Sequence, residues 1–362
     1  MFPQPLATVF PLVRMRDRAD GSKAPIVLTE PAAGMVVAGR YELERQIGEG
    51  GMACVWLACD RALDCPCALK FLRSDLAANT EIRTRFEREA AVVARIRSRH
   101  VVRIFDRGES LGLPFIVMEY LEGEDLGSRL LRQATLEPWQ AYQIVSQIAR
   151  GLTLAHARGV VHRDVKPENI FLVLDEPGEV AKLLDFGIAK QILPSPTDAA
   201  TLTGLFLGTV QYASPEQLRG EGVDWRSDLW SLAVVTFECL TGRRPFEADS
   251  LAELCAAVLY EPVPRITDLD GRFPAELEAW FERALARDPE CRFQSARELA
   301  DALADALACV RARLPNLVPR ATLETLPDDD LSSAVAGSRT WLDVADGAPR
   351  AALRHSALAR RH

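Results

Sequence analysis

The sequence predicts an α+β fold of two lobes, a small β-rich lobe followed by a larger and mainly helical one. Short β-type runs bounded by turn residues occupy most of the region between Tyr41 and Glu119. After Leu121, longer segments repeat apolar residues every three or four positions, as amphipathic helices do. The length of 362 residues also favours more than one core, because single cores stop growing near about 250 to 300 residues.

The first lobe is predicted to contain five strands and one helix. The strands are expected at residues 41–47, 53–59, 67–72, 101–106 and 115–119. The helix is expected at residues 81–97, where Ile82, Phe86, Ala90, Val93 and Ile96 recur on one face and charged residues occupy the other. A sheet covered by one helix is therefore expected.

The second lobe is predicted to be helical, with helices at residues 138–158, 228–240, 251–260, 274–287 and 296–312. Residues 1–40 contain five prolines and little periodicity, so we expect a flexible N-terminal leader. Residues 313–362 also lose periodicity, and we expect a disordered C-terminal tail.

Composition excludes several classes of protein. The net charge of −8, from 51 acidic and 43 basic residues, argues against a nucleic-acid binder with a broad basic face. The eight cysteines are scattered rather than grouped in zinc-binding pairs, which favours reduced thiols and a cytoplasmic protein. No apolar run reaches the roughly 18 residues of a membrane span. We therefore expect a cytoplasmic chain without its own membrane anchor.

A glycine cluster separates the first two predicted strands, reading Ile47-Gly48-Glu-Gly50-Gly51-Met-Ala53-Cys-Val55. Glycine lets the backbone come close to phosphate oxygens because no side chain intervenes. Considered alone, this cluster is explained better by an ordinary tight hairpin than by a phosphate site.

Two motifs further along the chain carry more specific chemistry. The first is His162-Arg163-Asp164-Val-Lys166-Pro-Glu-Asn169, and the second, Asp185-Phe-Gly, begins 16 residues after Asn169. Phosphoryl transfer needs a base for the acceptor hydroxyl, oxygen ligands for a metal ion and cations for the phosphates. These two motifs supply at least one candidate for each requirement.

Together with the strand sequence Cys67-Ala68-Leu69-Lys70, these motifs resemble the eukaryotic-like (Hanks-type) bacterial serine/threonine protein kinase family over about residues 41–312. The resemblance implies a bilobal kinase-like fold that transfers the γ-phosphate of ATP to Ser and Thr hydroxyls of protein substrates. It implies an N-lobe at residues 41–118, a hinge at 119–121 and a C-lobe at 122–312.

The resemblance also assigns catalytic roles. Asp164 becomes the catalytic base, Lys166 neutralises the transferred γ-phosphate, and Lys70 contacts the α- and β-phosphates. Glu89 on the predicted helix would pair with Lys70, and Glu87 is the competing candidate. The metal ligands would be Asn169 and Asp185, holding Mg²⁺ or, alternatively, Mn²⁺.

The ATP site implied by the resemblance combines the glycine-rich loop, the hinge and an apolar sandwich around adenine. Its residues are Ile47, Gly48, Gly50, Gly51, Val55, Ala68, Lys70, Met118, Glu119, Leu121, Asp125 and Phe171. Within this set Asp125 is expected to bind a ribose hydroxyl.

Three further residues are implied to brace the second lobe: Glu216 in Ser214-Pro-Glu216, Asp228 in Asp228-Leu-Trp-Ser231, and Arg292, which would pair with Glu216. Gly208-Thr209 resembles part of a peptide-docking segment. Two alternatives for function stay open at this stage, a pseudokinase scaffold and a small-molecule phosphotransferase of the same fold.

The chain also suggests a regulatory switch between Asp185 and Glu216. Arg163 and Lys190 would form a pocket for a phosphate carried by Thr201 or Thr203. Autophosphorylation between molecules would then require self-association of the chain.

Overall fold

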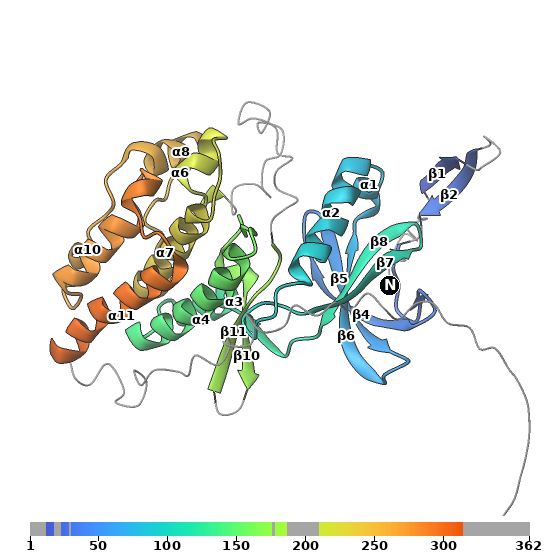
Figure 1. Cartoon of the computed structure of the whole chain (residues 1–362), viewed down its shortest axis with the longest axis horizontal. Helices are drawn as coiled ribbons and strands as arrows, with labels where there is room; N and C mark the ends of the chain where they lie inside the picture. Colours follow the sequence, from blue (N-terminus) through green and yellow to red (C-terminus); the bar gives the residue numbers. More distant parts are fainter. Residues whose placement is uncertain (1–11, 18–22, 29, 176–177, 187–209, 314–362) are drawn as a thin grey trace, which may run out of the picture. The chain divides into compact units, whose positions relative to one another are not determined.

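The computed structural model describes residues 12–17, 23–28, 30–175, 178–186 and 210–313, all of which lie in one compact unit, Met1–Thr322. Within it, a β-rich lobe is followed along the chain by a helical lobe (Figure 1). This is the predicted α+β, two-lobed arrangement.

A six-stranded antiparallel sheet forms the first lobe, in the order β3-β4-β5-β6-β8-β7. Its strands are β3 Val36–Val37, β4 Tyr41–Glu49, β5 Ala53–Asp60, β6 Cys65–Leu72, β7 Ile104–Ser110 and β8 Leu113–Glu119. The helices α1 Ser74–Ala77 and α2 Thr80–Val93 follow β6. Phe86 and Ala90 of α2 are buried against Leu69, Phe71 and Phe115 of the sheet, so the helix covers one sheet face.

Helix α2 begins where its sequence predicts but ends earlier. Asn79 caps its start, because the Asn79 side chain accepts hydrogen bonds from the backbone N–H groups of Glu81 and Ile82. The helix ends at Val93 rather than at residue 97, because the N–H groups of Arg95 and Ile96 bond three residues back, to Val92 and Val93. The apolar periodicity continues through this turn, which explains the longer prediction.

The second lobe contains a small sheet and a helical core. The sheet has the order β11-β10-β9, with β9 Gly123–Asp125, β10 Ile170–Asp175 and β11 Gly178–Leu183. The helical segments are α3 Leu126–Gln133, α4 Pro138–His156, η1 Pro167–Asn169, α6 Pro215–Arg219, α7 Arg226–Thr241, α8 Leu251–Tyr260, α9 Ile266–Leu269, α10 Ala275–Ala284, η4 Pro289–Cys291 and α11 Ala296–Arg313. Helix α7 is buried along nearly all its length and packs against α4 and α10, while α11 packs against α4 and α10 (Figure 1).

The described part of the N-terminal region, which was expected to be a flexible leader, contains three short strands. Strands β1 Leu12–Asp17 and β2 Lys23–Leu28 pair as an antiparallel hairpin, and β3 adds to the edge of the main sheet beside β4. Val37 of β3 is fully buried in the first-lobe core. A two-residue strand is too short to produce a detectable period, so no sequence pattern indicated β3.

Among the helices that the structure describes, none combines the length and the apolar composition needed to cross a membrane. The predicted C-terminal tail, residues 313–362, lies outside the described residues apart from the last residue of α11.

Candidate active site

A lysine from the first lobe meets a carboxylate from the second. Lys70 lies in β6, paired with Val55 of β5 and Ile116 of β8, and its Nζ is 2.6 Å from Oδ1 of Asp185, which follows β11. Partial burial of Asp185 would raise the pKa of its carboxyl, but the Lys70 ammonium holds that pKa below its ordinary value. Asp185 is therefore ionised at neutral pH and available to a cation.

The loop before η1 carries a second carboxylate, Asp164, and Asn169 at the end of η1 orients it. The Nδ2 of Asn169 donates to Oδ2 of Asp164 at 2.9 Å and to its backbone carbonyl at 2.8 Å. Lys166 Nζ lies 3.7 Å from the same Oδ2. Asp164 is thus fixed in orientation beside a cation, as a positioned base must be.

Asp228 of α7 binds the backbone of this loop. Its fully buried carboxylate accepts hydrogen bonds from the backbone N–H groups of His162, at 2.8 Å, and Arg163, at 2.7 Å. Arg163 has a φ of +65°, a conformation that costs free energy for a residue with a side chain. The two bonds from Asp228 offset that cost and fix the residue directly before Asp164.

His162 connects the two motif segments. Its Nδ1 accepts a hydrogen bond from the Asp164 N–H at 3.2 Å, so Nε2 carries the proton and donates to the Leu184 carbonyl at 2.7 Å. Burial lowers the pKa of His162, which keeps the ring neutral and suits this pattern. Asp164 and Asp185 are therefore positioned relative to each other through one buried imidazole.

Asn169 and Asp185 fit a hard divalent cation. Because Nδ2 of Asn169 is used by two oxygens of Asp164, the amide orientation is determined and Oδ1 is its remaining acceptor. The two backbones are also tied, since the Leu184 N–H donates to the Asn169 carbonyl at 2.8 Å. Over the described residues, no group of three or more His, Cys, Asp or Glu side chains could hold a metal. Asn169 and Asp185 would supply two oxygens to a cation, and substrate oxygens and water would complete its shell.

The glycine-rich loop joins β4 to β5 and offers an open backbone surface. A Cβ added to Gly48 would meet only Val55, at 3.7 Å, and one added to Gly50 would meet only the Ala53 carbonyl, at 3.7 Å. Neither glycine has a positive φ. The fold itself therefore does not require glycine at these positions, whereas close approach of a phosphate would.

The sheet register gathers the predicted adenine contacts on one face. Directly paired residues share a face of an antiparallel sheet, so Val55 lies with Lys70, and Ala68 lies with Met118. The same register adds Leu57 and Ile116, which sequence reasoning missed and which the alternation of side chains along β5 and β8 could have indicated. Ile47, which lies in the bulge between Gln46 and Gly48 of β4, is 38% exposed.

The predicted hinge lies at the end of β8 and just after it. The floor of the predicted adenine site is Phe171, which lies in β10. Met118 and Glu119 end β8, and Leu121 precedes β9, whose Asp125 pairs in register with Phe171 of β10. The Asp125 carboxylate caps α3 by accepting bonds from the N–H and hydroxyl of Ser128, at 2.8 and 2.7 Å. The structure thus shows a capping role, and the ribose contact stays a prediction.

Gly123 is a position beside the predicted hinge where the backbone requires glycine, and the sequence reasoning did not find it. Its φ is +154°, and an added Cβ would lie 2.0 Å from the Leu172 carbonyl oxygen. Only glycine allows β9 to cross β10 this closely. Its place two residues after the predicted hinge was the available signal.

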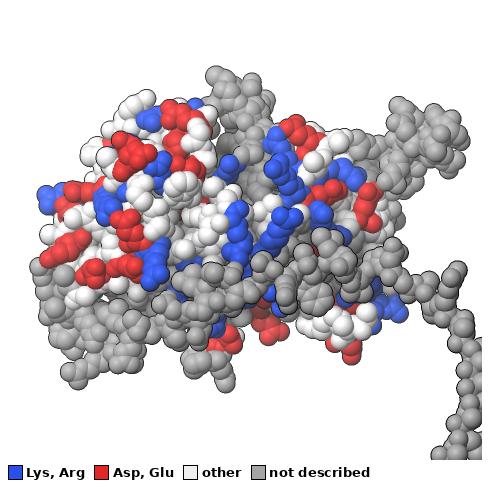
Figure 2. Space-filling view, viewed as in Figure 1, with Lys and Arg blue, Asp and Glu red and all other residues white. Residues whose placement is uncertain are grey.

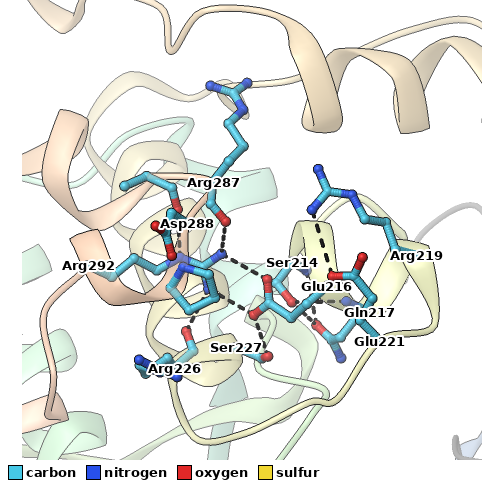
Figure 3. A network of polar contacts seen from close by, with 12 residues as sticks. Ser214, Glu216, Gln217, Arg219, Glu221, Arg226, Ser227, Arg287, Asp288 and Arg292 are labelled. Carbon is cyan, nitrogen blue, oxygen red and sulfur yellow. Dashed lines mark hydrogen bonds and ion pairs between the residues drawn. The ribbon is translucent and has the colours of Figure 1, made fainter.

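A second polar network braces the helical lobe (Figure 3). Arg292 donates to both carboxylate oxygens of Glu216 at 2.8 Å, and the Ser227 hydroxyl donates to Glu216 Oε1 at 2.6 Å. The Arg292 side chain is fully buried, and it also donates to the carbonyls of Ala286, Arg226 and Arg287. The residue after Glu216, Gln217, reaches the site itself, donating from Nε2 to the Arg163 carbonyl at 3.0 Å. This last contact was not anticipated.

Several predicted residues lie outside what the structure describes. Lys190, Thr201, Thr203 and the segment Gly208-Thr209 fall within residues 187–209. Glu89 lies in α2, but its side chain is not among those described. Gly51 is exposed at the tip of the glycine-rich loop.

Comparisons with known proteins agree with this geometry. The family model described as "Protein kinase domain" matches residues 41–303. The serine/threonine-protein kinase PksC of Streptomyces coelicolor is 38% identical over 326 residues, covering 88% of this chain and 57% of the relative. The serine/threonine-protein kinase PknD of Mycobacterium tuberculosis is 39% identical over 311 residues, covering 83% of this chain and 46% of that protein.

Among solved structures, the PknI kinase domain of Mycobacterium tuberculosis superimposes with a TM-score of 0.61 at 32% identity, covering 77% of this chain and 100% of that one. This chain spans about half the length of the two curated relatives named above.

Proposed function

The chain belongs to the protein kinase domain family, and from this we propose that it transfers the γ-phosphate of ATP to serine and threonine hydroxyls of proteins. The observation that carries the proposal is that two contacting pairs, Lys70 with Asp185 and Asn169 with Asp164, are linked to each other through His162 and the backbone of Leu184. With Lys166 beside Asp164, this arrangement supplies a base, metal ligands and phosphate-binding cations, which phosphoryl transfer requires.

Each residue has a role that follows from its surroundings. Asp164, oriented by Asn169, accepts the proton of the substrate hydroxyl. Lys166, beside Asp164, neutralises the γ-phosphate, and Lys70, with Glu89 as its proposed partner, orients the α- and β-phosphates. Bound ATP and Mg²⁺, the ion held by Asn169 and Asp185 in this proposal, supply the phosphoryl group and the charge that stabilises it in the transition state.

The adenine would lie on the sheet face that carries Val55 and Ala68, above Phe171 and against the hinge at Met118, Glu119 and Leu121. Ile47, Gly48, Gly50 and Gly51 would cover the phosphates from the glycine-rich loop, and Asp125 would approach the ribose. The register-defined face and the open glycines support this assignment.

Protein substrates are favoured over nucleic acid. On the face drawn in Figure 2, basic side chains gather near the middle with acidic side chains on both sides, rather than extending over the face as the broad basic field that binds phosphate backbones. The relatives are named serine/threonine-protein kinases, and Lys166 two residues after the base fits that class. A reducing compartment such as the cytoplasm suits the free thiols of Cys54, Cys59, Cys65, Cys67, Cys239, Cys255 and Cys291.

Radiolabelled ATP separates this function from a scaffold without turnover. We expect label on a generic basic protein and on the kinase itself, and none with Lys70→Met, because phosphate positioning is lost. A folded wild-type protein that labels neither would support the scaffold, and label confined to added small molecules would support a small-molecule phosphotransferase.

We further propose that phosphorylation of Thr201, Thr203 or both activates the enzyme. Arg163 precedes the base, and its partial burial lowers the pKa of its guanidinium, because burial imposes a free-energy cost on the charged form. A phosphate carrying about −1.5 to −2 charges would offset that cost, with Lys190 as the second cation. The phosphate on the threonine would then favour the conformation in which the segment Gly208-Thr209 is aligned to dock a substrate peptide.

The switch is tested by mass spectrometry of protein expressed alone, which should find phosphate on these threonines. Dephosphorylation should lower the activity, and an Asp185→Asn protein should acquire the phosphate only when mixed with wild type, which tests transfer between molecules. A Thr201→Ala, Thr203→Ala protein that phosphorylates an added substrate as fast as wild type would contradict the switch.

A further inference from the structure

An ion pair lies directly behind the proposed hinge and has no part in the roles assigned above. Lys182 of β11 places its Nζ 2.7 and 2.8 Å from the two carboxylate oxygens of Glu119, the last residue of β8. Their side chains are only 15% and 21% exposed. Charges this shielded are weakly screened by salt, so the attraction is stronger than that of an ordinary surface pair.

The Glu119 side chain points away from the proposed adenine face. Glu119 is paired in register with Cys67, whose side chain is buried in the core behind the sheet, whereas Met118 is paired with Ala68 on the nucleotide face. The carboxylate is therefore placed to orient the Glu119 backbone from behind rather than to touch the nucleotide.

A second contact fixes the same peptide. The Glu119 N–H donates to the Arg103 carbonyl at 3.0 Å, and the Arg103 N–H donates to Glu119 Oε1 at 2.8 Å. Together with the two contacts from Lys182, these bonds restrain both the backbone and the side chain of the first hinge residue.

Lys182 also belongs to the floor of the proposed adenine site. It is paired in register with Phe171 of β10, so the two side chains share a face of the small sheet. Three residues later the same strand leads to Asp185. One lysine therefore connects the hinge, the floor and the strand that leads to the metal ligand.

We propose that Lys182 and Glu119 are positioning residues for adenine recognition: their ion pair fixes the hinge peptide at residues 119–121 relative to Phe171, and so sets the affinity for the adenine part of the nucleotide. The inference rests on the proposed function. Hydrogen bonds to a planar base need the peptide within about 0.5 Å of the right place, and a restraint on the peptide is how the protein achieves this.

The test compares two competitive inhibitors that occupy different parts of the site. Adenosine needs the hinge but no phosphate contacts, and tripolyphosphate needs the glycine-rich loop and Lys70 but no hinge. In Lys182→Met we expect the inhibition constant for adenosine and the KM for ATP to rise roughly tenfold, because the hinge is released. Tripolyphosphate inhibition and kcat should change less than about threefold.

Two further variants serve as controls. Lys182→Arg preserves the charge and can bond both carboxylate oxygens, so it should retain most of the adenosine affinity. Glu179→Gln removes the ion pair with Arg129, 2.7 Å long, from the same strand β11 without touching the hinge, so adenosine inhibition should stay at the wild-type value.

Unchanged adenosine inhibition in a folded Lys182→Met protein would overturn the inference, as would an equal loss for adenosine and tripolyphosphate. Calorimetric binding of adenosine to the same variants gives the answer without catalysis. A wild-type protein that binds adenosine but transfers no phosphate would therefore refute the proposed function and leave the positioning role testable.

Discussion

Asp185 and Glu216 are both carboxylates that face a cation, yet their surroundings differ in a way that separates chemistry from architecture. The Asp185 side chain is 46% exposed and contacts Lys70 at a single oxygen. The Glu216 side chain is 6% exposed, and both of its oxygens are bonded by Arg292, which is itself bonded to three backbone carbonyls. A carboxylate with an accessible oxygen can bind a metal cation. A buried carboxylate whose two oxygens already accept hydrogen bonds from the protein can only stabilise the fold.

The largest effect should come from Asp185→Asn. Removing this charge removes a metal ligand and should lower kcat by roughly a thousandfold or more, since lost charge stabilisation costs several kcal/mol of barrier. The melting temperature should change little, because the side chain is half exposed. Phosphate-transfer rates and thermal unfolding measured on one preparation check both statements, and a folded variant within about tenfold of wild-type kcat would contradict the metal role.

The opposite pattern is expected of Arg292→Met. The substitution leaves Glu216 buried without its cation, which should cost about 3–5 kcal/mol in the free energy of unfolding. Denaturant titration measures this loss. The fraction that remains folded should bind ATP with near wild-type affinity, and a variant as stable as wild type would show that the buried pair does not brace the lobe.

Acid should weaken the same brace. Burial alone would raise the pKa of Glu216, but the hydrogen bonds from Arg292 hold it at about 2, below the ordinary 4.5. A depressed folded-state pKa contributes stability that is fully present above the unfolded-state value and is lost as the pH falls from about 4.5 towards 2. The free energy of unfolding should therefore fall over this range, and Glu216→Gln should fall less steeply. Parallel curves for the two proteins would contradict the assignment.

The sequence predicted most of the elements whose periodicity is long, and it singled out motif residues whose side chains the structure brings together. The helix at Leu251–Tyr260 has the predicted bounds, and Pro138–His156 and Ala296–Arg313 differ by at most two residues at either end. Helix α3 was not predicted, because its eight residues show too few turns for a period and its start depends on the Asp125 cap. The five first-lobe strands were found, with boundaries that shifted by up to four residues.

What the sequence could not provide is the pairing of residues far apart in the chain. Glu119 and Lys182 are separated by 63 positions, and Gln217 and Arg163 by 54. No local pattern encodes such a contact; it follows from strand register and loop placement, which only the folded chain determines. The resemblance to the kinase family predicted the pair of Glu216 and Arg292, because both residues belong to the motifs of that family. The pair of Glu119 and Lys182 belongs to none of the motifs named above.

The smallest effect should come from removing the C-terminal tail. Every residue that we assign to the Asp185 site or to the Glu216 network precedes residue 293, and the described core extends only to Leu307 of α11. Ending the chain after residue 315 keeps α11, which packs against α4 and α10 and so supports the loop that carries Asp164. We therefore expect residues 1–315 to fold and to retain kcat within about threefold of the full chain, because no proposed catalytic contact is lost.

Enzyme kinetics with a common protein substrate, together with a melting curve of each protein, measure the effect of this truncation. If the shortened protein folded with the same melting temperature but transferred no phosphate, the tail would be part of the catalytic unit, and the comparison between an accessible site and a buried brace would need a third region.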